Sequence, residues 1–402
     1  MHDKRTRNAA AAPPVPIRLT AAALLATTLG VLPVFFFGTL AVVIRADLGF
    51  SQSRIGFATA AFFAASAVLS APGGWTAEHL GGVRTAVTGV VLATCALGGI
   101  AFFARSYSQL LALLALSGAA NALVQPATNG LLAGRVAQAR RGAGFGVKQA
   151  AVPLASTLSG VALPLLGLTL GWRGAFAVAA LLGAPVLLLL TGVRRPQPVP
   201  GAAPAVLARG SRWPLVALSV VAAAAAGAGN GLGAFYVDSA VTAGTAPATA
   251  GVFLAIGSGT GIVARVLWGW WTDRLRVRRL SVVSGLLIVG AAGFALIGAQ
   301  PPAPLLLVAT VIAYAFGWGW NGLFIAAVVD AYPQAPSSAT GVAQAGVFGG
   351  AVIVPAVFGL VAESASYPAA WLMAAALLCG AACLITVVGR RLPARQSAAR
   401  SP

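Results

Sequence analysis

Twelve long apolar stretches, separated by short polar segments, follow one another along the 402-residue chain. Each stretch is nearly free of charge and about 20 residues long or more, which is the length a helix needs to cross a bilayer. The pattern predicts twelve membrane-spanning helices, six in each half of the chain. The expected spans are 20–44, 53–74, 84–103, 109–132, 142–168 and 173–193, then 213–237, 247–268, 280–299, 303–328, 338–362 and 367–389.

Composition indicates the same class of protein. Only 8% of the residues are charged, 59% are hydrophobic, and the mean hydropathy is +0.90. Soluble globular proteins carry about 25% charged residues. So few charges do not cover the surface of a soluble fold of this length. We therefore expect an all-α polytopic membrane protein whose main partner is the lipid bilayer.

The formal net charge of +19 is distributed unevenly along the chain. Of the 26 Lys and Arg residues, 20 lie in the two tails, the central linker and the loops of one side, and four lie in the loops of the other side. The remaining two, Lys148 and Arg265, fall within spans. This is the positive-inside bias, and it places both termini in the cytoplasm of a plasma (cell inner) membrane. The basic charge is explained by topology and anionic lipid, so no nucleic-acid partner is expected.

One eleven-residue segment occurs twice, 195 residues apart: GWTAEHLGGVR at 74–84 and GWWTDRLRVRR at 269–279. The same offset relates other positions, including Gly38 and Gly233, and Gly56 and Gly251. Two six-helix halves whose ends lie on one side are parallel repeats, with a substrate site expected at the midplane between them. We divide the chain into an N-terminal six-helix bundle (1–193), a Pro-rich cytoplasmic linker (194–212) and a C-terminal bundle (213–402).

These features resemble the major facilitator superfamily of transporters over essentially the full length of the chain. The residues that carry the resemblance are Gly74, Glu78, Gly81 and Arg84 in the first copy, and Gly269, Asp273 and Arg274 in the second. The resemblance implies that Glu78, Arg84, Asp273 and Arg274 form a cytoplasmic latch, made in the outward-open state and broken on inward opening. The match departs from the usual pattern at Glu78, where Asp is usual, and at Arg276, which replaces the middle glycine.

Arg265 is the main candidate for substrate binding. It precedes Asp273 by eight residues and so lies about 12 Å further into the membrane. A charge at such depth costs about 2.5–3.5 kcal/mol on insertion scales and must be compensated. Arginine at this place in the eighth span resembles superfamily branches that carry nitrate, oxalate or monocarboxylates, which implies an anionic substrate. The alternative role is that of a structural partner to the cytoplasmic latch.

Other polar residues within the spans complete the expected site. Lys148 fits either a place in the central cavity or a side chain that snorkels to the cytoplasmic headgroups. Asn121, Gln125 and Asn129 recur on one face of the fourth span, and Tyr314, Trp318 and Asn321 on one face of the tenth. The expected substrate ligands are Arg265, Lys148, Gln149, Asn121, Asn230, Asn321 and Gln344. Each amide is equally suited to a hydrogen bond between helices.

Carboxylates are few, since the chain has only seven Asp and Glu residues, and none lies in the middle of a span. A mid-membrane carboxylate proton relay is therefore not expected. Asp47, Asp238 and Glu363, at external helix ends, are the carboxylates available for proton coupling, although a solvated helix-end charge is the favoured role of each. The sequence has no G-x-x-x-x-G-K-[ST] loop and no metal-ligand spacing, so neither a cofactor nor enzyme activity is expected.

We therefore predict a monomeric, bacterial-type secondary transporter that moves a small organic or inorganic anion by alternating access, with a proton or a counter-anion as the driving partner. The alternative is a proton-coupled drug or metabolite efflux antiporter. Trp318 and Trp320 would suit that role, whereas the fifth span lacks the glycines of the G-x-x-x-G-P element that efflux branches often carry. A third class is a membrane sensor that no longer transports.

Overall fold

The computed structural model describes residues 17–133, 147–193, 212–275, 277–332 and 336–391. Within these residues, twelve helical segments are long and apolar enough to cross a membrane. The twelve spans predicted from hydropathy are thereby confirmed, and each prediction is the physical consequence of apolar side chains that lipid can solvate. The predicted linker, apart from Arg212, lies outside the described residues.

The helices of the first half are α1 (Ile17–Leu48), α2 (Gln52–Leu80), α3 (Gly82–Phe103), α4 (Tyr107–Ala133), α6 (Ala151–Ala162), η2 (Leu163–Gly167), α7 (Gly171–Leu181) and α8 (Gly183–Thr191). Those of the second half are α9 (Arg212–Thr242), α10 (Pro247–Leu275), α11 (Arg279–Gly298), α12 (Ala303–Ile312), η4 (Ala313–Gly317), α13 (Asn321–Ala331), α14 (Pro336–Ser364) and α15 (Tyr367–Arg391).

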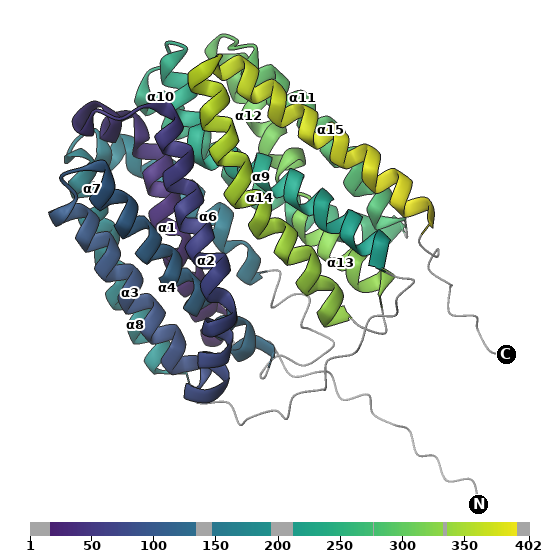
Figure 1. Cartoon of the computed structure of the whole chain (residues 1–402), viewed down its shortest axis with the longest axis horizontal. Coiled ribbons are helices and arrows are strands. Elements are labelled where there is room, and N and C mark those ends of the chain that lie inside the picture. The colour runs from purple at the N-terminus through teal and green to yellow at the C-terminus, as the bar shows by residue number, and fades with distance from the viewer. Residues whose placement is uncertain (1–16, 134–146, 194–211, 276, 333–335, 392–402) are drawn as a thin grey trace, which may run out of the picture.

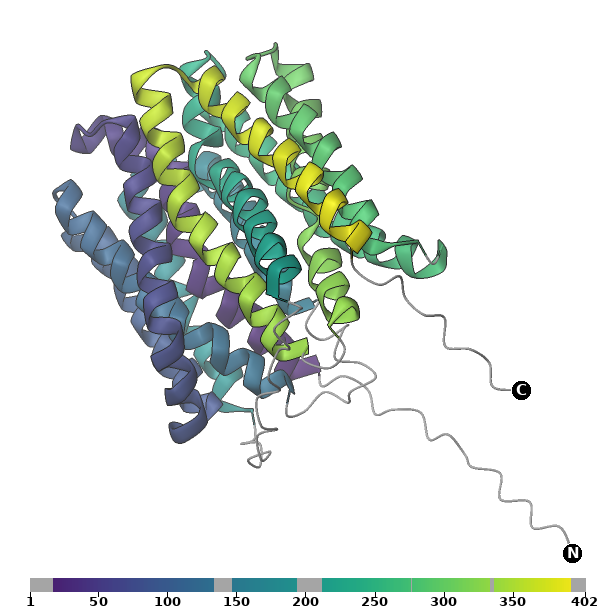
Figure 2. The ribbon, with the colours of Figure 1, turned by 45° about the vertical axis from the view of Figure 1, so that its right-hand side comes forward.

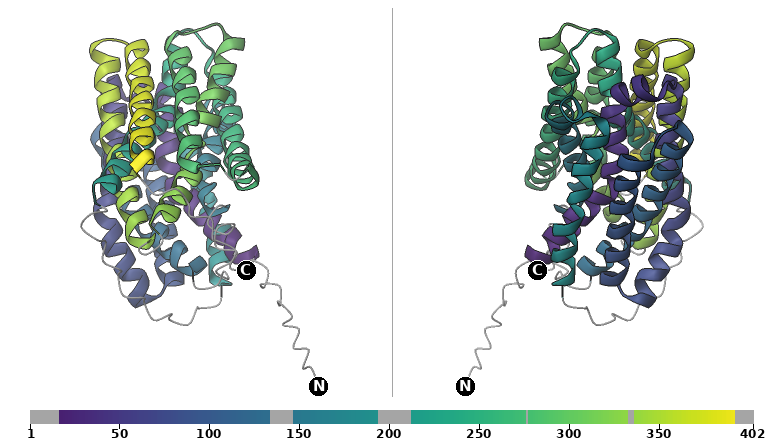
Figure 3. Two further views of the ribbon diagram at one scale, coloured as in Figure 1. Left: turned by 90° about the vertical axis from the view of Figure 1, so that its right-hand side faces the viewer. Right: turned by 90° about the vertical axis from the view of Figure 1, so that its left-hand side faces the viewer.

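The helices form two bundles, α1 to α8 and α9 to α15, which lie side by side (Figure 1). The start of α1 and the end of α15 point toward the same end of the molecule (Figure 3). We call this end the terminal face and the other end the opposite face. The bundles are packed together near the opposite face and diverge toward the terminal face, as the views in Figures 1 and 2 both show.

The two bundles meet at repeat-related glycines. A Cβ atom on Gly38 would lie 2.3 Å from the carbonyl oxygen of Gly233, which is too close for any side chain. Gly233 is the counterpart of Gly38 at the 195-residue offset. Two equivalent positions contact each other directly only when they lie on or near a twofold axis. The contact between α1 and α9 therefore marks the axis that relates the bundles.

A second set of contacts has the same symmetry. A Cβ atom on Gly56 of α2 would lie 2.2 Å from the carbonyl oxygen of Pro355 in α14. A Cβ atom on Gly251 of α10 would lie 2.7 Å from the carbonyl oxygen of Gly160 in α6. Each residue of the second contact has its counterpart in the first, again 195 residues away. The duplication seen in the sequence is thus a duplication of contacts between the bundles.

The tenth span is not one continuous helix, which corrects the expectation for 303–328. The helix α12 passes into the π-helical segment η4, and α13 begins only at Asn321. Close packing accompanies the break, because a Cβ atom on Gly290 of α11 would lie 2.3 Å from the Cα of Gly317. The single helical face expected for Tyr314, Trp318 and Asn321 is therefore absent. Such π-helical segments release backbone carbonyl groups from the helix ladder.

Candidate functional site

Arg265 lies on the side of α10 that faces the first bundle. Gly251, Ser258 and Arg265 are spaced by seven residues, which is nearly two helical turns, so all three lie on one face. Gly251 approaches α6 closely, and the Ser258 Oγ lies 3.0 Å from the Thr157 Oγ1 of α6. Arg265 follows on the same face about 10 Å nearer the terminal face. It therefore lies nearer the terminal face than the contact of Ser258 with Thr157.

The guanidinium of Arg265 is only partly satisfied. Its Nη2 donates a hydrogen bond to the carbonyl oxygen of Trp318 at 2.9 Å, and its Cζ lies 5.6 Å from the centre of the Trp318 ring. Its Nη1 is buried and has no hydrogen-bond partner. Among the described residues, no carboxylate forms an ion pair with this arginine. A buried donor without an acceptor is costly, and here the donor belongs to a cation.

Trp318 connects this arginine with both bundles. Its indole packs against Gly229 of α9, where a Cβ atom would lie 2.3 Å from the ring. Its ring centroid lies 5.9 Å from that of Phe35 in α1 and 5.4 Å from that of Tyr314 in η4. An aromatic cluster with members from both bundles therefore lies next to Arg265.

Lys148 has a different environment. Lys148 is only 1% exposed. Its Nζ donates one hydrogen bond to the Gln125 Oε1 and another, at 2.9 Å, to the Asn129 Oδ1, and both acceptors belong to α4. The snorkelling alternative is therefore wrong, since the amine points into the first bundle. Lys148 precedes Thr157 by nine residues, or two and a half turns, so the two lie on opposite faces. The polar stripe expected on α4 is confirmed in part, as a set of partners for Lys148.

The amides expected to bind substrate are dispersed. Asn121 is 2% exposed, and its Nδ2 donates to the Ser66 Oγ at 2.7 Å, while its Oδ1 is buried without a partner. Asn230 donates to the Ala226 carbonyl of its own helix at 2.8 Å. Asn230 also lines a narrow space between α1, α2 and α9, together with Val34, Phe35, Thr59, Phe63, Gly233 and Ala234.

The remaining three predicted ligands lie on other elements. Gln149 is exposed, next to the buried Lys148. Asn321 is partly exposed and is the first residue of α13. The Gln344 Oε1 on α14 is buried without a hydrogen-bond partner. Asn321 is therefore the predicted amide that the chain connects most directly to the Arg265 site, since it follows Trp318 by three residues.

Asp238 does not have the solvated helix-end environment that was favoured for it. Its side chain is 2% exposed, forms an ion pair with Arg45 at 2.5 Å and accepts a hydrogen bond from the Tyr367 hydroxyl. Arg45 belongs to α1 and Asp238 to α9, so the ion pair joins the two bundles near the opposite face. The sequence did not indicate this pairing, because 193 residues separate the partners.

The other two external carboxylates also have partners. The Glu363 Oε2 accepts the backbone N–H of Ser53 at 2.8 Å, at the start of α2, and so it too joins the bundles. A carboxylate at a helix N-terminus is favoured by the helix dipole. Asp47 accepts from Arg173 at 2.7 Å and from the Trp172 Nε1 at 3.0 Å, and all three lie in the first bundle. Two of the three carboxylates therefore close the opposite face.

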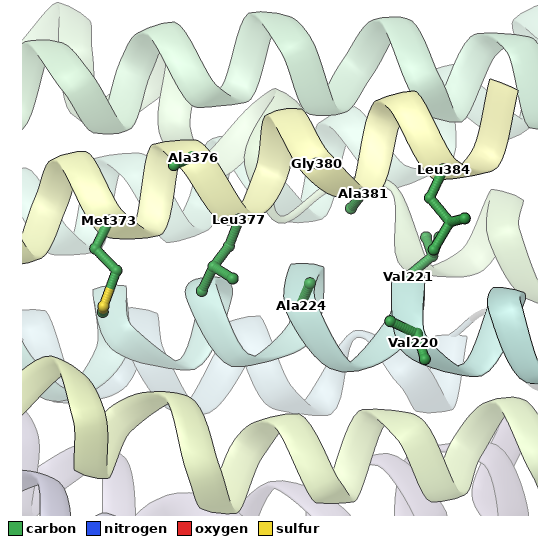
Figure 4. A pocket seen from close by; sticks show the side chains of 9 residues that line it. All are labelled: Val220, Val221, Ala224, Met373, Ala376, Leu377, Gly380, Ala381 and Leu384. Atoms are coloured by element: carbon green, nitrogen blue, oxygen red, sulfur yellow. The ribbon is translucent and has the colours of Figure 1, made fainter. Parts of the chain in front are cut away.

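A pocket of about 410 Å³ lies away from these residues, between α9 and α15. Figure 4 shows that its lining is aliphatic apart from the Met373 thioether. It is lined by Val220, Val221, Ala224, Met373, Ala376, Leu377, Gly380, Ala381 and Leu384. Such a pocket has no polar group to orient a solute. The candidate functional site is therefore the surroundings of Arg265 and not this pocket.

A family model of the Major Facilitator Superfamily matches residues 22–344. The chain belongs to the Major Facilitator Superfamily. Its twelve spans, its parallel repeats and its duplicated loop segment are explained by this membership, and the resemblance found in the sequence is confirmed. The chain is accordingly a multi-pass membrane protein of this superfamily.

Among known superfamily members, an MFS-type efflux pump of Mycolicibacterium smegmatis is 32% identical over 220 residues, which cover 50% of this chain and 51% of that protein. The match thus takes in about half the length of that relative. A bacterial homologue of the human lysosomal transporter Spinster, inward-facing and unoccupied, is similar with a TM-score of 0.78 at 16% identity, over 94% of this chain and 98% of that one. A D-xylose–proton symporter has a TM-score of 0.75 at 16% identity, over 92% and 97%. These two likenesses show the fold alone.

The superfamily's loop segments lie at the terminal face. Glu78 and Arg84 are exposed, and neither forms an ion pair with another described residue. Arg274 lies over the Trp270 ring, 4.4 Å from its centroid. The side chain of Asp273 lies outside the described residues. Asp330, which was not among the predicted site residues, pairs with Arg279 at 2.5 Å within the second bundle. The available signal was its place at the end of the tenth span, on the same side of the membrane as the arginines of the loop before α11.

Proposed function

We propose that this superfamily member is a secondary transporter that moves a small organic or inorganic anion by alternating access. With both termini in the cytoplasm of the plasma membrane, as the charge bias predicts, the diverging bundles correspond to an inward-facing state. The closed contacts of Asp238 and Glu363 at the opposite face support this assignment, as does the absence of any ion pair between Glu78 or Arg84 and another described residue at the terminal face. Rocking of one bundle against the other would break the contacts of Asp238 and Glu363 and allow Glu78 and Arg84 to form contacts at the terminal face.

The observation that carries the anion assignment is the Nη1 of Arg265, a buried cationic donor without an acceptor beside the aromatic cluster between the bundles. An anion that enters from the cytoplasmic side would supply both the missing acceptor and the missing charge. Lys148 makes a smaller contribution in this proposal. Its amine is held by Gln125 and Asn129, so it serves mainly to join α4 to the fifth span.

Coupling to a proton would use the opposite face. Asp238 and Glu363 each hold the bundles together there, so their protonation would weaken the closed contacts. A proton taken up with the anion would also offset the charge that the anion carries through the membrane. Exchange against a second anion would achieve the same electrical balance without these carboxylates.

Uptake into proteoliposomes tests the proposal directly. A panel of labelled nitrate, oxalate and monocarboxylates would be offered to the parent protein and to the Arg265→Ala variant. Loss of a charge-assisted hydrogen bond of about 1.5–3 kcal/mol predicts that uptake falls at least roughly tenfold. Arg105→Ala, which removes an exposed arginine near the opposite face, is the matched control and is expected to transport normally. Undiminished uptake by Arg265→Ala would remove the arginine from the site.

A second candidate function is efflux of drugs or metabolites. It is favoured by the similarity to the mycobacterial efflux pump, and the aromatic cluster around Trp318 would suit an apolar substrate. Growth of a deletion strain on candidate acids, compared with its drug-sensitivity profile, separates the two functions. Drug hypersensitivity with normal growth on every acid favours efflux.

A further inference from the structure

We propose that a monocarboxylate binds at the break in the tenth span, held jointly by the Nη1 of Arg265 and by the backbone N–H groups at the start of α13. This inference rests on the proposed anion transport and specifies its substrate class. It adds a backbone site, at Asn321 and Gly322, that complements the guanidinium.

The start of α13 has the properties of an anion site. The helix is 11 residues long and begins at Asn321, directly after the break. The N–H groups of its first turn have no acceptor within the helix, and its dipole places partial positive charge there. Helix N-termini bind anions for these two reasons. In other transporters, half-helices that begin near the midplane point their N-termini at anionic substrate groups.

Arg265 is attached to the same break. Its Nη2 is bound to the carbonyl of Trp318, which precedes Asn321 by three residues, and its Nη1 is buried and unpartnered. The Nε1 of Trp320, a fully buried residue at the N-cap of α13, is a further donor without an acceptor. Cationic and neutral donors therefore gather beside the positive end of a helix.

Two carbonyl groups at the break already accept hydrogen bonds. The carbonyl of Trp318 binds Arg265, and the carbonyl of Ala315 accepts the Trp268 Nε1 at 3.0 Å. The Nη1 of Arg265 and the Nε1 of Trp320 remain buried donors without acceptors, which indicates a ligand that supplies acceptor atoms and negative charge. A sugar or another neutral solute would leave the charge of Arg265 uncompensated.

Space at the backbone is available on one side of α13. Gly322, its second residue, is exposed, and a Cβ atom there would have no neighbour within 4 Å. The Nη2 of the guanidinium is bound to Trp318 and Lys148 is engaged by α4, so the site offers a single cation, which one carboxylate matches and a second anionic group does not. One carboxylate oxygen would accept from Nη1 and the other from α13, with the organic part against Trp318 and Tyr314.

Gly322→Pro removes one backbone donor, and Gly322→Ala is the matched control that keeps the donor and adds a methyl group to open space. Proline is tolerated in the first turn of a helix, where its N–H is not part of the ladder. Binding of benzoate, and of benzamide as its uncharged analogue, would be measured by calorimetry on the purified full chain. We expect Gly322→Pro to weaken benzoate binding at least roughly tenfold and Gly322→Ala by less than about twofold, with benzamide weak throughout.

A second measurement does not depend on how well the proline variant folds. A Gly322→Cys variant, in a chain whose Cys95, Cys379 and Cys383 are replaced by Ala, would be alkylated with a maleimide. Saturating benzoate is expected to slow this alkylation, and benzamide is not. Equal alkylation rates with and without benzoate would overturn the placement at α13.

The two proposals fail in different ways. Suppose that the parent binds benzoate, that Arg265→Ala abolishes this binding, and that Gly322→Pro binds benzoate as well as Gly322→Ala does. The backbone site is then wrong, while the proposed anion transport stands. If the parent neither binds nor transports any anion of the panel, the proposed function itself fails. If oxalate binds more tightly than benzoate, the assignment to monocarboxylates is wrong.

Discussion

Lys148 shows how a charged residue inside a bundle is accommodated by neutral partners in place of a carboxylate. Its amine is buried and bound by two neutral amide oxygens from one helix, Gln125 and Asn129, four residues apart on α4. The periodicity of the stripe could be predicted from the sequence, because residues four apart share a helix face. The partner of this stripe could not be predicted in the same way, since Lys148 belongs to another helix. A similar limit applies to Arg265, whose depth was predictable and whose partner, a carbonyl freed by a helix break, was not.

A double-mutant cycle tests the Lys148 contact. Lys148→Met keeps an apolar stem and removes the donor, and Gln125→Leu removes one acceptor. Each single change leaves a buried group unsatisfied and is expected to cost about 1–3 kcal/mol, seen as a lower thermal midpoint in detergent. The double variant should lose less than the sum, because neither partner is left alone. Strict additivity would show that the two side chains do not interact.

The tenth span shows that hydropathy does not determine whether a membrane-spanning segment is one continuous helix. Its hydropathy is that of one uninterrupted helix, yet the structure divides it into α12, η4 and α13. The break coincides with a contact from outside the span, the close approach of Gly290 on α11 to Gly317. Hydropathy reports only the balance between lipid and water along one segment. It contains no information on which helix packs against the segment, and therefore none on where the segment bends or breaks.

Two glycines of α11 provide a matched test of this packing. Gly290→Ala would place a methyl group 2.3 Å from the Cα of Gly317, whereas at Gly285 a Cβ atom meets nothing within 4 Å. Both changes raise helix propensity equally. Overpacking predicts a loss of about 1–3 kcal/mol for Gly290→Ala only, with a lower thermal midpoint. A Gly290→Ala protein as stable as Gly285→Ala would contradict the close approach.

At the scale of the whole molecule, closure of the opposite face depends on contacts between the bundles. Symmetric glycine contacts bring the backbones together, and Arg45, Asp238, Tyr367 and Glu363 add polar contacts across the interface. The glycine contacts could in principle be foreseen, because the 195-residue repeat implies a twofold axis. The ion pair of Arg45 with Asp238 could not be foreseen, because the repeat-related positions carry no such pair.

Substitution of Asp238 is expected to shift the conformational equilibrium. Asp238→Asn weakens the pairing with Arg45, and a loss of about 1.4 kcal/mol would raise the outward-open population roughly tenfold. Spin labels at Ser108 and Ser364, exposed on different bundles near the opposite face, would report a new population at longer distance. Asp47→Asn is the control, since its partner Arg173 lies in the same bundle. Equal distance distributions for the two variants would exclude Asp238 from the closure.

The sequence alone determined the class of the protein, its twelve spans, its two parallel halves and the superfamily. These properties follow from quantities that are local or periodic: the transfer free energy of each segment, the side on which its flanking charges lie, and a fixed offset between two copies. A cation deep in the eighth span and a polar stripe in the fourth were visible on the same basis.

Only the tertiary structure decided which groups meet. It turned Lys148 toward α4, buried Asp238 against Arg45, broke the tenth span beside Gly290, and left one nitrogen of Arg265 buried without a partner. The physical reason is that lipid solvates every apolar helix face nearly equally. The choice between faces is therefore made by close packing and by polar partners from distant segments, which no single stretch of sequence contains.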